Sequence, residues 1–150
     1  MNLSSVIKPE DVILDLSVAT KASLINRLAR HAAARTGIGE QIIHSALLGR
    51  ERFGSTGIGN GVAVPHAPVV GLVEPFAALV ILKRPIDFEA VDDLPVDIVF
   101  VLLSAPETTS DHLKVLATVA RKTREQPTLQ MLRSAESPAA AYSILVEQAE

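Results

Sequence analysis

Two near-continuous apolar runs constrain the fold of this chain more than any other feature. Residues 77–82 read AALVIL and residues 96–103 read VDIVFVLL. Runs of this length and composition are typical of β-strands that are buried on both faces. The segments around them have helical periodicity, and no break in composition, internal repeat or low-complexity stretch divides the chain. The pattern predicts one α/β domain.

The N-terminal third predicts a short strand over residues 11–16 and two amphipathic helices. Thr20 is expected to cap the first helix, and Gly37 lies where a helix ends in a left-handed residue. The second helix is expected over residues 39–52, with Arg50 and Arg52 in its last turn. The apolar positions that define the buried face of the first helix are Leu24, Ile25, Leu28, Ala29 and Ala32.

The C-terminal third predicts three further helices. Ser110 is expected to be an N-cap with Asp111 in the first turn, and a short helix is expected over residues 128–133. Ser137 and Pro138 form a cap followed by a proline at the first helical position, which predicts a final helix. The expected buried positions are Leu113, Leu116, Ala117 and Ala120 in the first of these helices, and Tyr142, Leu145 and Val146 in the last.

Composition narrows the functional class. A length of 150 residues suits one domain, and the net charge of −3 argues against a nucleic-acid binder. The absence of cysteine excludes disulfides and thiolate catalysis. We see no signal peptide, and no apolar run approaches the ~20 residues of a membrane span. We therefore expect a soluble cytoplasmic protein.

A glycine-rich stretch carries the most informative chemistry. Four glycines lie between Gly54 and Gly61, and a short strand over residues 62–64 follows them. Pro65 then ends the strand, and His66 comes next. A flexible loop, a stiff strand and a terminal imidazole indicate a reactive group placed at the rim of a sheet.

His112 and Arg50 are the other candidate site residues. If Ser110 is the cap, His112 lies in the first turn of a helix, where backbone N–H groups attract anions. A neutral imidazole is a competent phosphoryl acceptor near neutral pH, and Arg50 offers a fork of donors to phosphate oxygens. Taken singly, His112 is as readily an exposed polar residue, and Arg50 a solvated arginine at a helix end. Together with His66 they predict a phosphate site.

Other sites fit the residues less well. The loop lacks the Gly-Lys-Ser/Thr of a Walker A motif, and it is followed by a strand, unlike a dinucleotide fingerprint. Zinc would need a third ligand beyond His66 and His112. Ser55 has no nucleophile elbow around it. His31 and His44 lie within predicted helices and are interpreted as surface or boundary residues. We expect no metal and no cofactor.

Residues 57–66 (GIGNGVAVPH) resemble the phosphorylation-site motif of enzyme IIA proteins of the fructose/mannitol class in the bacterial phosphotransferase system. Residues 85–96, the run to Leu103, and His112-Leu113 before an apolar helix resemble the same family in order and spacing. The resemblance covers nearly the whole chain as a single domain, residues 1–150. It implies a mixed β-sheet sandwiched between α-helices.

The resemblance also implies residue roles. His66 would accept phosphate from an HPr-like phosphocarrier, His112 and Arg50 would stabilise the phosphoryl group, and Ser55 and Thr56 would be loop hydroxyls near it. The lone domain and the loop sequence are similar to the nitrogen-regulatory branch, whose members regulate potassium transport or sensor kinases according to phosphorylation state.

Two alternatives stay open: a sugar-specific enzyme IIA that passes phosphate to a separate IIB, and a non-catalytic module that binds an anion or a partner. The sequence departs from the family at Ala67, where many relatives have glycine, and at Lys114, where the enteric type has histidine.

Overall fold

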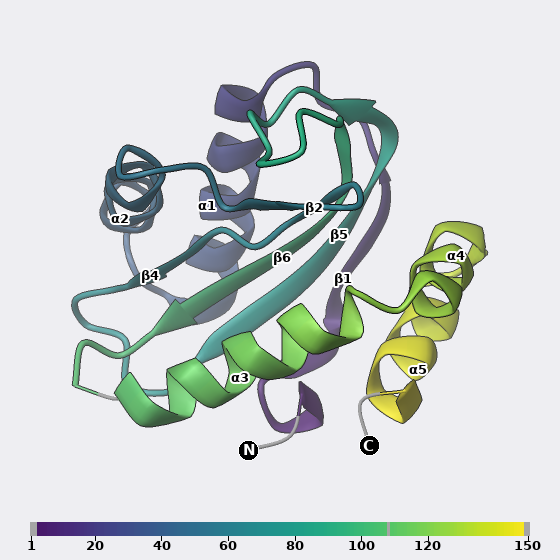
Figure 1. Ribbon diagram of the computed structural model, residues 1–150. Helices are drawn as coiled ribbons and strands as arrows, with labels where there is room; N and C mark the ends of the chain where they lie inside the picture. Colours follow the sequence, from purple (N-terminus) through teal and green to yellow (C-terminus); the bar gives the residue numbers. More distant parts are fainter. Residues whose placement is uncertain (1–2, 108, 149–150) are drawn as a thin grey trace.

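A mixed sheet forms the middle layer of the protein. The computed structural model describes residues 3–107 and 109–148, and within them six strands form one sheet in the order β1-β5-β6-β3-β2, with β4 also paired to β6 (Figure 1). The fold predicted from the sequence is confirmed. The strands are β1 Ile7–Leu16, β2 Gly57–Gly59, β3 Val62–Ala63, β4 His66–Pro68, β5 Phe76–Ile86 and β6 Val96–Ser104.

The two apolar runs form the centre of this sheet. β5 and β6 pair antiparallel, and β1 pairs parallel to the outer edge of β5. Along its other edge, β6 pairs parallel first with β3 and then with β4, so that Val62 lies opposite Ile98 and His66 opposite Leu102. The short β2 pairs antiparallel with β3. β6 therefore aligns the segment that carries His66.

Helices cover both faces, as Figure 1 shows. α1 Lys21–Thr36 and α2 Glu40–Glu51 pack on one face, while α3 Thr109–Lys122, α4 Gln126–Ser134 and α5 Pro138–Gln148 pack on the other. A short 3-10 helix, η1 Leu3–Ser5, precedes β1. Alternate residues of each strand contribute to the two cores, as the pleat requires. Val99, Val101 and Leu103 face α1 and α2, whereas Ile98, Phe100 and Leu102 face α3 to α5.

The caps predicted for α1 and α5 and most predicted helices are confirmed. The Oγ1 of Thr20 accepts a hydrogen bond from the N–H of Ser23 at 3.1 Å, and Gly37 ends α1 with φ +79°. The Oγ of Ser137 likewise accepts from the N–H of Ala140 at 3.1 Å at the start of α5. All five apolar positions predicted for α1 are buried. In α5 Leu145 is buried, while Tyr142 and Val146 are half-buried.

The prediction for α3 is wrong in its start and in its buried face. α3 begins at Thr109, so Ser110 lies inside the helix rather than before it; the side chains of residues 109–111 lie outside the described part. Val115 and Val119 are the buried apolar residues of the helix. Of the predicted set, Leu113 is 63% exposed and Ala117 is exposed, while Leu116 and Ala120 are half-buried. The predicted face and the observed face both have helical spacing. Contact with the sheet buries the face that begins at His112 and includes Val115 and Val119.

None of the helices in the described residues is long and apolar enough to cross a membrane.

Candidate functional site

His66 is placed by β6. After β3 the chain bends through Val64 and Pro65, and the carbonyl of Pro65 accepts a hydrogen bond from the N–H of Leu102 at 2.9 Å. β4 begins at His66 and continues along the same edge. β3 ends at Ala63, one residue short of the strand predicted over residues 62–64, and a second short strand, β4, begins directly after Pro65. The alternation from Val62 and Val64 places the half-buried imidazole on the face covered by α3.

The backbone determines which nitrogen of His66 carries the proton. Nδ1 lies 2.7 Å from the carbonyl oxygen of Val64. A carbonyl only accepts hydrogen bonds, so Nδ1 is the protonated nitrogen and donates. Nε2 then holds the free lone pair of the neutral ring. The imidazole is thereby held in orientation and presents a nucleophilic nitrogen at Nε2.

His112 lies beside this ring. The two imidazole centroids are 5.7 Å apart with an interplanar angle of 45°. His112 is the fourth residue of α3, in its first turn as predicted, and it is half-buried at the head of the inward face of the helix. Burial first, and charge on His66 second, lower the pKa of His112. His112 is therefore a neutral donor or acceptor near pH 7.

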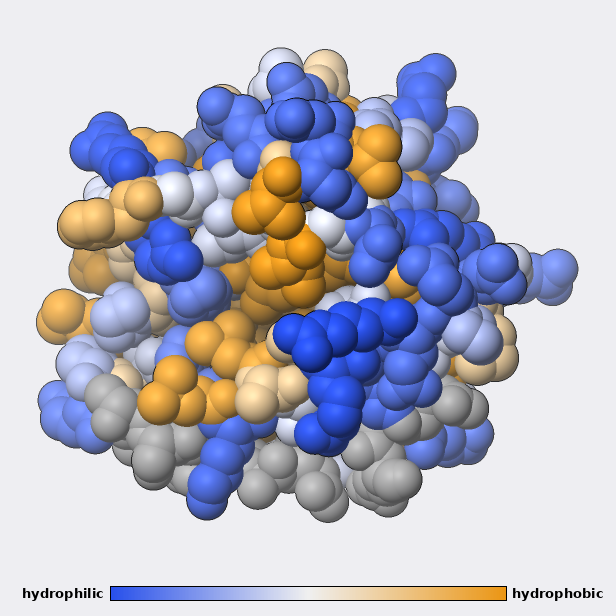
Figure 2. All heavy atoms as spheres, viewed as in Figure 1, coloured by the Kyte–Doolittle hydropathy of each residue, from blue (hydrophilic) through white to orange (hydrophobic). Residues whose placement is uncertain are grey.

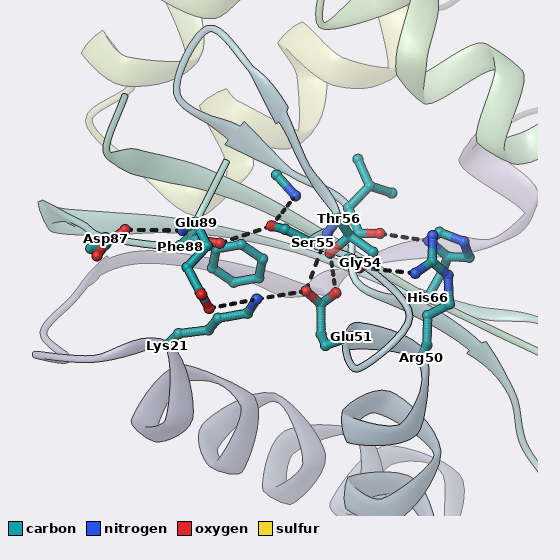
Figure 3. A network of polar contacts seen from close by, with 12 residues as sticks. Lys21, Arg50, Glu51, Gly54, Ser55, Thr56, His66, Asp87, Phe88 and Glu89 are labelled. Atoms are coloured by element: carbon teal, nitrogen blue, oxygen red, sulfur yellow. Dashed lines mark hydrogen bonds and ion pairs between the residues drawn. The ribbon is translucent and has the colours of Figure 1, made fainter. Parts of the chain in front are cut away.

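Arg50 approaches the site from the last turn of α2. Its Nη1 donates to the carbonyl of Gly54 at 3.0 Å, and Figure 3 shows its side chain rising from α2 toward His66. This bond uses one of the guanidinium donors and leaves others for a ligand. The structure thus brings the imidazoles of His66 and His112 together, while the guanidinium of Arg50 is anchored to the loop at Gly54.

The hydroxyls of Ser55 and Thr56 are engaged away from the imidazoles. The Oγ of Ser55 donates to the carbonyl of Phe88 at 2.8 Å and accepts from the N–H of Gly57 at 3.0 Å. Thr56 is buried, and its hydroxyl donates to the carboxylate of Glu51. Both residues organise the loop in this structure, and direct contact between their hydroxyls and phosphate stays a prediction.

The glycines of the loop are explained by close neighbours. A Cβ added at Gly57 would lie 2.8 Å from Cα of Ala90, so the segment after β5 leaves no space for a side chain. Gly61 has φ +80°, and a Cβ there would collide with the guanidinium of Arg133. That guanidinium binds both carboxylate oxygens of Asp97 and the carbonyl of Asn60. The glycines allow tight packing around the loop as well as turning.

Two charged residues that the sequence reasoning did not single out also lie beneath the loop. Glu51, the last residue of α2, has a side chain that is only 4% exposed, and it pairs with Lys21 at 2.9 Å. The sequence held one signal for Glu51: it directly follows Arg50 at the C-terminal end of a predicted helix, where a carboxylate is disfavoured and so needs another reason to be there.

Large apolar side chains are exposed in the loop after α2, in β2 and in α3. Phe53 is 93% exposed in the loop after α2, Ile58 is 43% exposed in β2, and Leu113 is 63% exposed in α3. Figure 2, seen from the same side as Figure 1, shows hydrophobic residues gathered over the strands between α3 and the β2–β3 hairpin. Exposed apolar residues that gather on one face are typical of a protein-binding surface.

A family model described as "Phosphoenolpyruvate-dependent sugar phosphotransferase system, EIIA 2" matches residues 5–148. The chain belongs to this enzyme IIA family. A nitrogen regulatory protein of Bradyrhizobium diazoefficiens is 40% identical over 145 residues, which cover 97% of this chain and 95% of that protein.

Solved structures agree with the family. Nitrogen regulatory protein IIA-Ntr from Neisseria meningitidis has a TM-score of 0.91 at 28% identity, covering 94% of this chain and 97% of that one. IIA mannitol from Escherichia coli has a TM-score of 0.74 at 20% identity, covering 92% and 97%, and this likeness concerns the fold alone.

The two departures from the family pattern are compatible with the site of this enzyme IIA protein. Ala67 is 1% exposed in β4, and its methyl group packs in the core under α1 and α2. Lys114 is exposed on α3, where it adds a positive charge two residues after His112. No group of three or more histidine, aspartate or glutamate side chains among residues 3–107 and 109–148 is arranged to hold a metal ion.

Proposed function

We propose that this enzyme IIA protein is a phosphohistidine carrier whose phosphoryl acceptor is Nε2 of His66. The observation that carries the proposal is the 2.7 Å contact between His66 Nδ1 and the carbonyl of Val64. It fixes the tautomer in which Nε2 is nucleophilic, without an additional general base.

The transfer step balances without any further reagent. The donor is a phosphohistidine on an HPr-like carrier. The N–P bond of the donor breaks as the Nε2–P bond forms, and the donor nitrogen keeps the electron pair. Positive charge develops on the His66 ring, and the Nδ1–H bond to Val64 strengthens as it does. The same groups serve the reverse step, in which His66 passes phosphate onward.

His112 and Arg50 stabilise the phosphoryl group in this proposal. Phosphoryl transfer depends mainly on positioning and on donors aimed at the equatorial oxygens. A neutral His112 offers one N–H donor beside His66, and the free N–H groups of Arg50 offer charge-assisted bonds. Ser55 and Thr56 contribute through the loop that they hold together.

We further infer that the carrier belongs to the nitrogen-regulatory branch. It takes phosphate from an HPr-like protein in the cytoplasm and regulates partners such as potassium transport proteins or sensor kinases by its phosphorylation state. The 40% identity to a nitrogen regulatory protein over nearly the whole of both chains supports this branch. The exposed Leu113, directly after His112, and the exposed Phe53, three residues after Arg50, fit the binding of a protein surface near His66.

A sugar-specific role is the second candidate. The family model is described for the sugar phosphotransferase system, and IIA mannitol shares the fold. In that case the chain hands phosphate to a separate IIB protein. The third candidate is a module that binds an anion or a partner at the histidine pair without being phosphorylated. The free Nε2 of His66 favours the two phosphocarrier roles over this one.

Incubation with phosphoenolpyruvate, enzyme I and an HPr-like carrier tests the proposal. We expect mass spectrometry of the intact chain to show the gain of one acid-labile phosphate, and His66→Ala to abolish it. His44→Ala is the matched control and should be phosphorylated normally. Absence of phosphate on the wild type with every carrier would refute the carrier role. Transfer onward to a IIB protein at a comparable rate would favour the sugar-specific role.

A further inference from the structure

A series of hydrogen bonds connects the ion pair of half-buried Lys21 and buried Glu51 to the His66 ring. Nζ of Lys21 lies 2.9 Å from Oε1 of Glu51, and the same oxygen accepts from the N–H of Thr56 at 3.1 Å. The carbonyl of Thr56 accepts from the N–H of Val64 at 2.9 Å. The carbonyl of Val64 in turn accepts from Nδ1 of His66 at 2.7 Å, and Figure 3 shows the two ends of this series.

The ion pair is not explained by helix stability. Lys21 is the first residue of α1 and Glu51 the last residue of α2, so each charge lies at the helix end that disfavours it. Burying both groups also has a desolvation cost, and apolar replacements of buried ion pairs are often as stable. Lys21 has further partners, since its Nζ lies 4.5 Å from the Phe88 ring centroid and 3.6 Å from Glu89.

The carboxylate of Glu51 makes two bonds to one loop residue. It accepts from both the N–H and the hydroxyl of Thr56, so the backbone of Thr56 is held in position and orientation. The turn between these two residues contains Gly54, whose N–H donates to the carbonyl of Glu51 and whose carbonyl accepts from Arg50. The side chain of Glu51 therefore holds the segment that binds His66, and its backbone carbonyl holds the turn whose carbonyl binds Arg50.

We propose that Glu51, with Lys21 as its counter-ion, is a positioning residue for phosphoryl transfer, acting through Thr56 and Val64 on the orientation and tautomer of His66. Glu51 touches neither the imidazole nor the phosphoryl group. Its contribution is to hold Thr56 so that the Val64 carbonyl stays aimed at Nδ1. The inference rests on the proposed carrier function of His66.

Two double variants separate the hydrogen bonds from the charges. Lys21→Met/Glu51→Gln removes both charges but keeps an acceptor for the N–H of Thr56 and a donor for its hydroxyl. Lys21→Met/Glu51→Leu removes the charges and these bonds together. Neither variant leaves a buried charge without a partner, so a difference between them reports on the bonds to Thr56.

The readouts are the imidazole ¹⁵N spectrum of His66 and the rate of phosphoryl acceptance. We expect the glutamine variant to keep the Nδ1–H tautomer and a rate within about threefold of wild type. We expect the leucine variant to show a mixture of tautomers and a rate lower by about 10- to 100-fold. A leucine variant with the wild-type spectrum and rate overturns the proposal, as does a wild-type His66 protonated at Nε2.

Asp11→Asn is the control for a loss of stability alone. Asp11 is another buried carboxylate, its side chain 2% exposed, and it binds His31 and Arg35 in a place separated from His66 by β5 and β6. We expect it to lower the unfolding temperature without changing the His66 spectrum; a tautomer change like that of the leucine variant overturns the proposal.

Two further cases are decided separately. If the leucine variant does not fold, Thr56→Val replaces it, since this change removes only the hydroxyl bond to Glu51. An altered His66 spectrum in Thr56→Val supports the proposal, and an unaltered spectrum overturns it.

The ¹⁵N spectrum of His66 needs no phosphoryl donor. A wild type that takes up no phosphate therefore refutes the carrier function, while the tautomers still decide the role of Glu51.

Discussion

The imidazole rings of His66 and His112 lie 5.7 Å apart. The two residues come from distant segments of the chain, since His66 follows the glycine-rich loop and His112 lies at the start of α3. The strand that carries His66 directs its ring toward α3, and the first turn of α3 directs His112 toward the sheet. A centroid separation of 5.7 Å is within the range of contacting rings, so one small ligand can reach both imidazoles.

We predict that His112→Ala folds but accepts phosphate about 10²-fold more slowly, because one N–H donor to the phosphoryl group is lost. The side chain is half-buried at the end of the inward face of α3, so its removal opens space at the site rather than in the core. Single-turnover phosphorylation and circular dichroism measure the two properties. An unfolded variant would show that His112 belongs to the core.

The lowered pKa of His112 predicts a pH dependence of stability. Between the folded-state pKa and the ordinary value of 6.5, the unfolded chain binds a proton that the folded protein does not. The free energy of unfolding therefore falls as the pH decreases below 6.5, and His112 adds no slope above it. We expect the unfolding temperature of the wild type to drop more between pH 7 and pH 5 than that of His112→Ala. Parallel curves would contradict the shift.

For Arg50, we predict that lysine is a poor substitute. Lysine carries the charge but cannot bind the Gly54 carbonyl and a phosphate oxygen through one planar fork. We expect kcat for phosphoryl acceptance to fall about tenfold in Arg50→Lys, with a smaller change in the KM for the carrier. Arg52→Lys, at the exposed neighbouring position, should match the wild type. A change confined to KM and sensitive to salt would assign Arg50 to carrier docking instead.

Much of the fold could be predicted from local sequence patterns, because each of those patterns is compatible with only one local structure. The runs over residues 77–82 and 96–103 have no polar face, so burial on both sides was forced. Thr20 and Gly37 satisfy backbone groups at the two ends of α1, which is local chemistry. The face of α3 was different: two apolar sets with the same spacing were available, and contact with the sheet selects between them.

The site was predictable only in part for a similar reason. His66, His112 and Arg50 stand out as residue types beside recognisable motifs. The role of Glu51 depends on Lys21, thirty positions earlier in the chain, and on a carbonyl at Val64 that no side-chain pattern reveals. Contacts made through the backbone and between distant helix ends are properties of the folded chain.

The corrected face of α3 gives a test of stability. Val119 is fully buried, so Val119→Ala should lower the free energy of unfolding by ~1–3 kcal/mol through lost burial and a small cavity. Leu113 is 63% exposed, and Leu113→Ala should change it by less than ~0.5 kcal/mol. Urea denaturation of both variants decides between the two faces. The opposite ranking would restore the face predicted from the sequence.

Phe53 provides the test of the docking surface. Phe53 follows Arg50 by three residues and its side chain is 93% exposed, so it packs little in the free protein and its burial under a partner is favourable. We predict that Phe53→Ser leaves the unfolding temperature unchanged and raises the KM for the HPr-like carrier about tenfold, with little change in kcat. Val73→Ser is the matched control, because Val73 is 83% exposed and lines a separate cavity with Lys8 and Arg35. Equal effects of the two substitutions would show that the carrier binds elsewhere or that exposed apolar residues act on solubility alone.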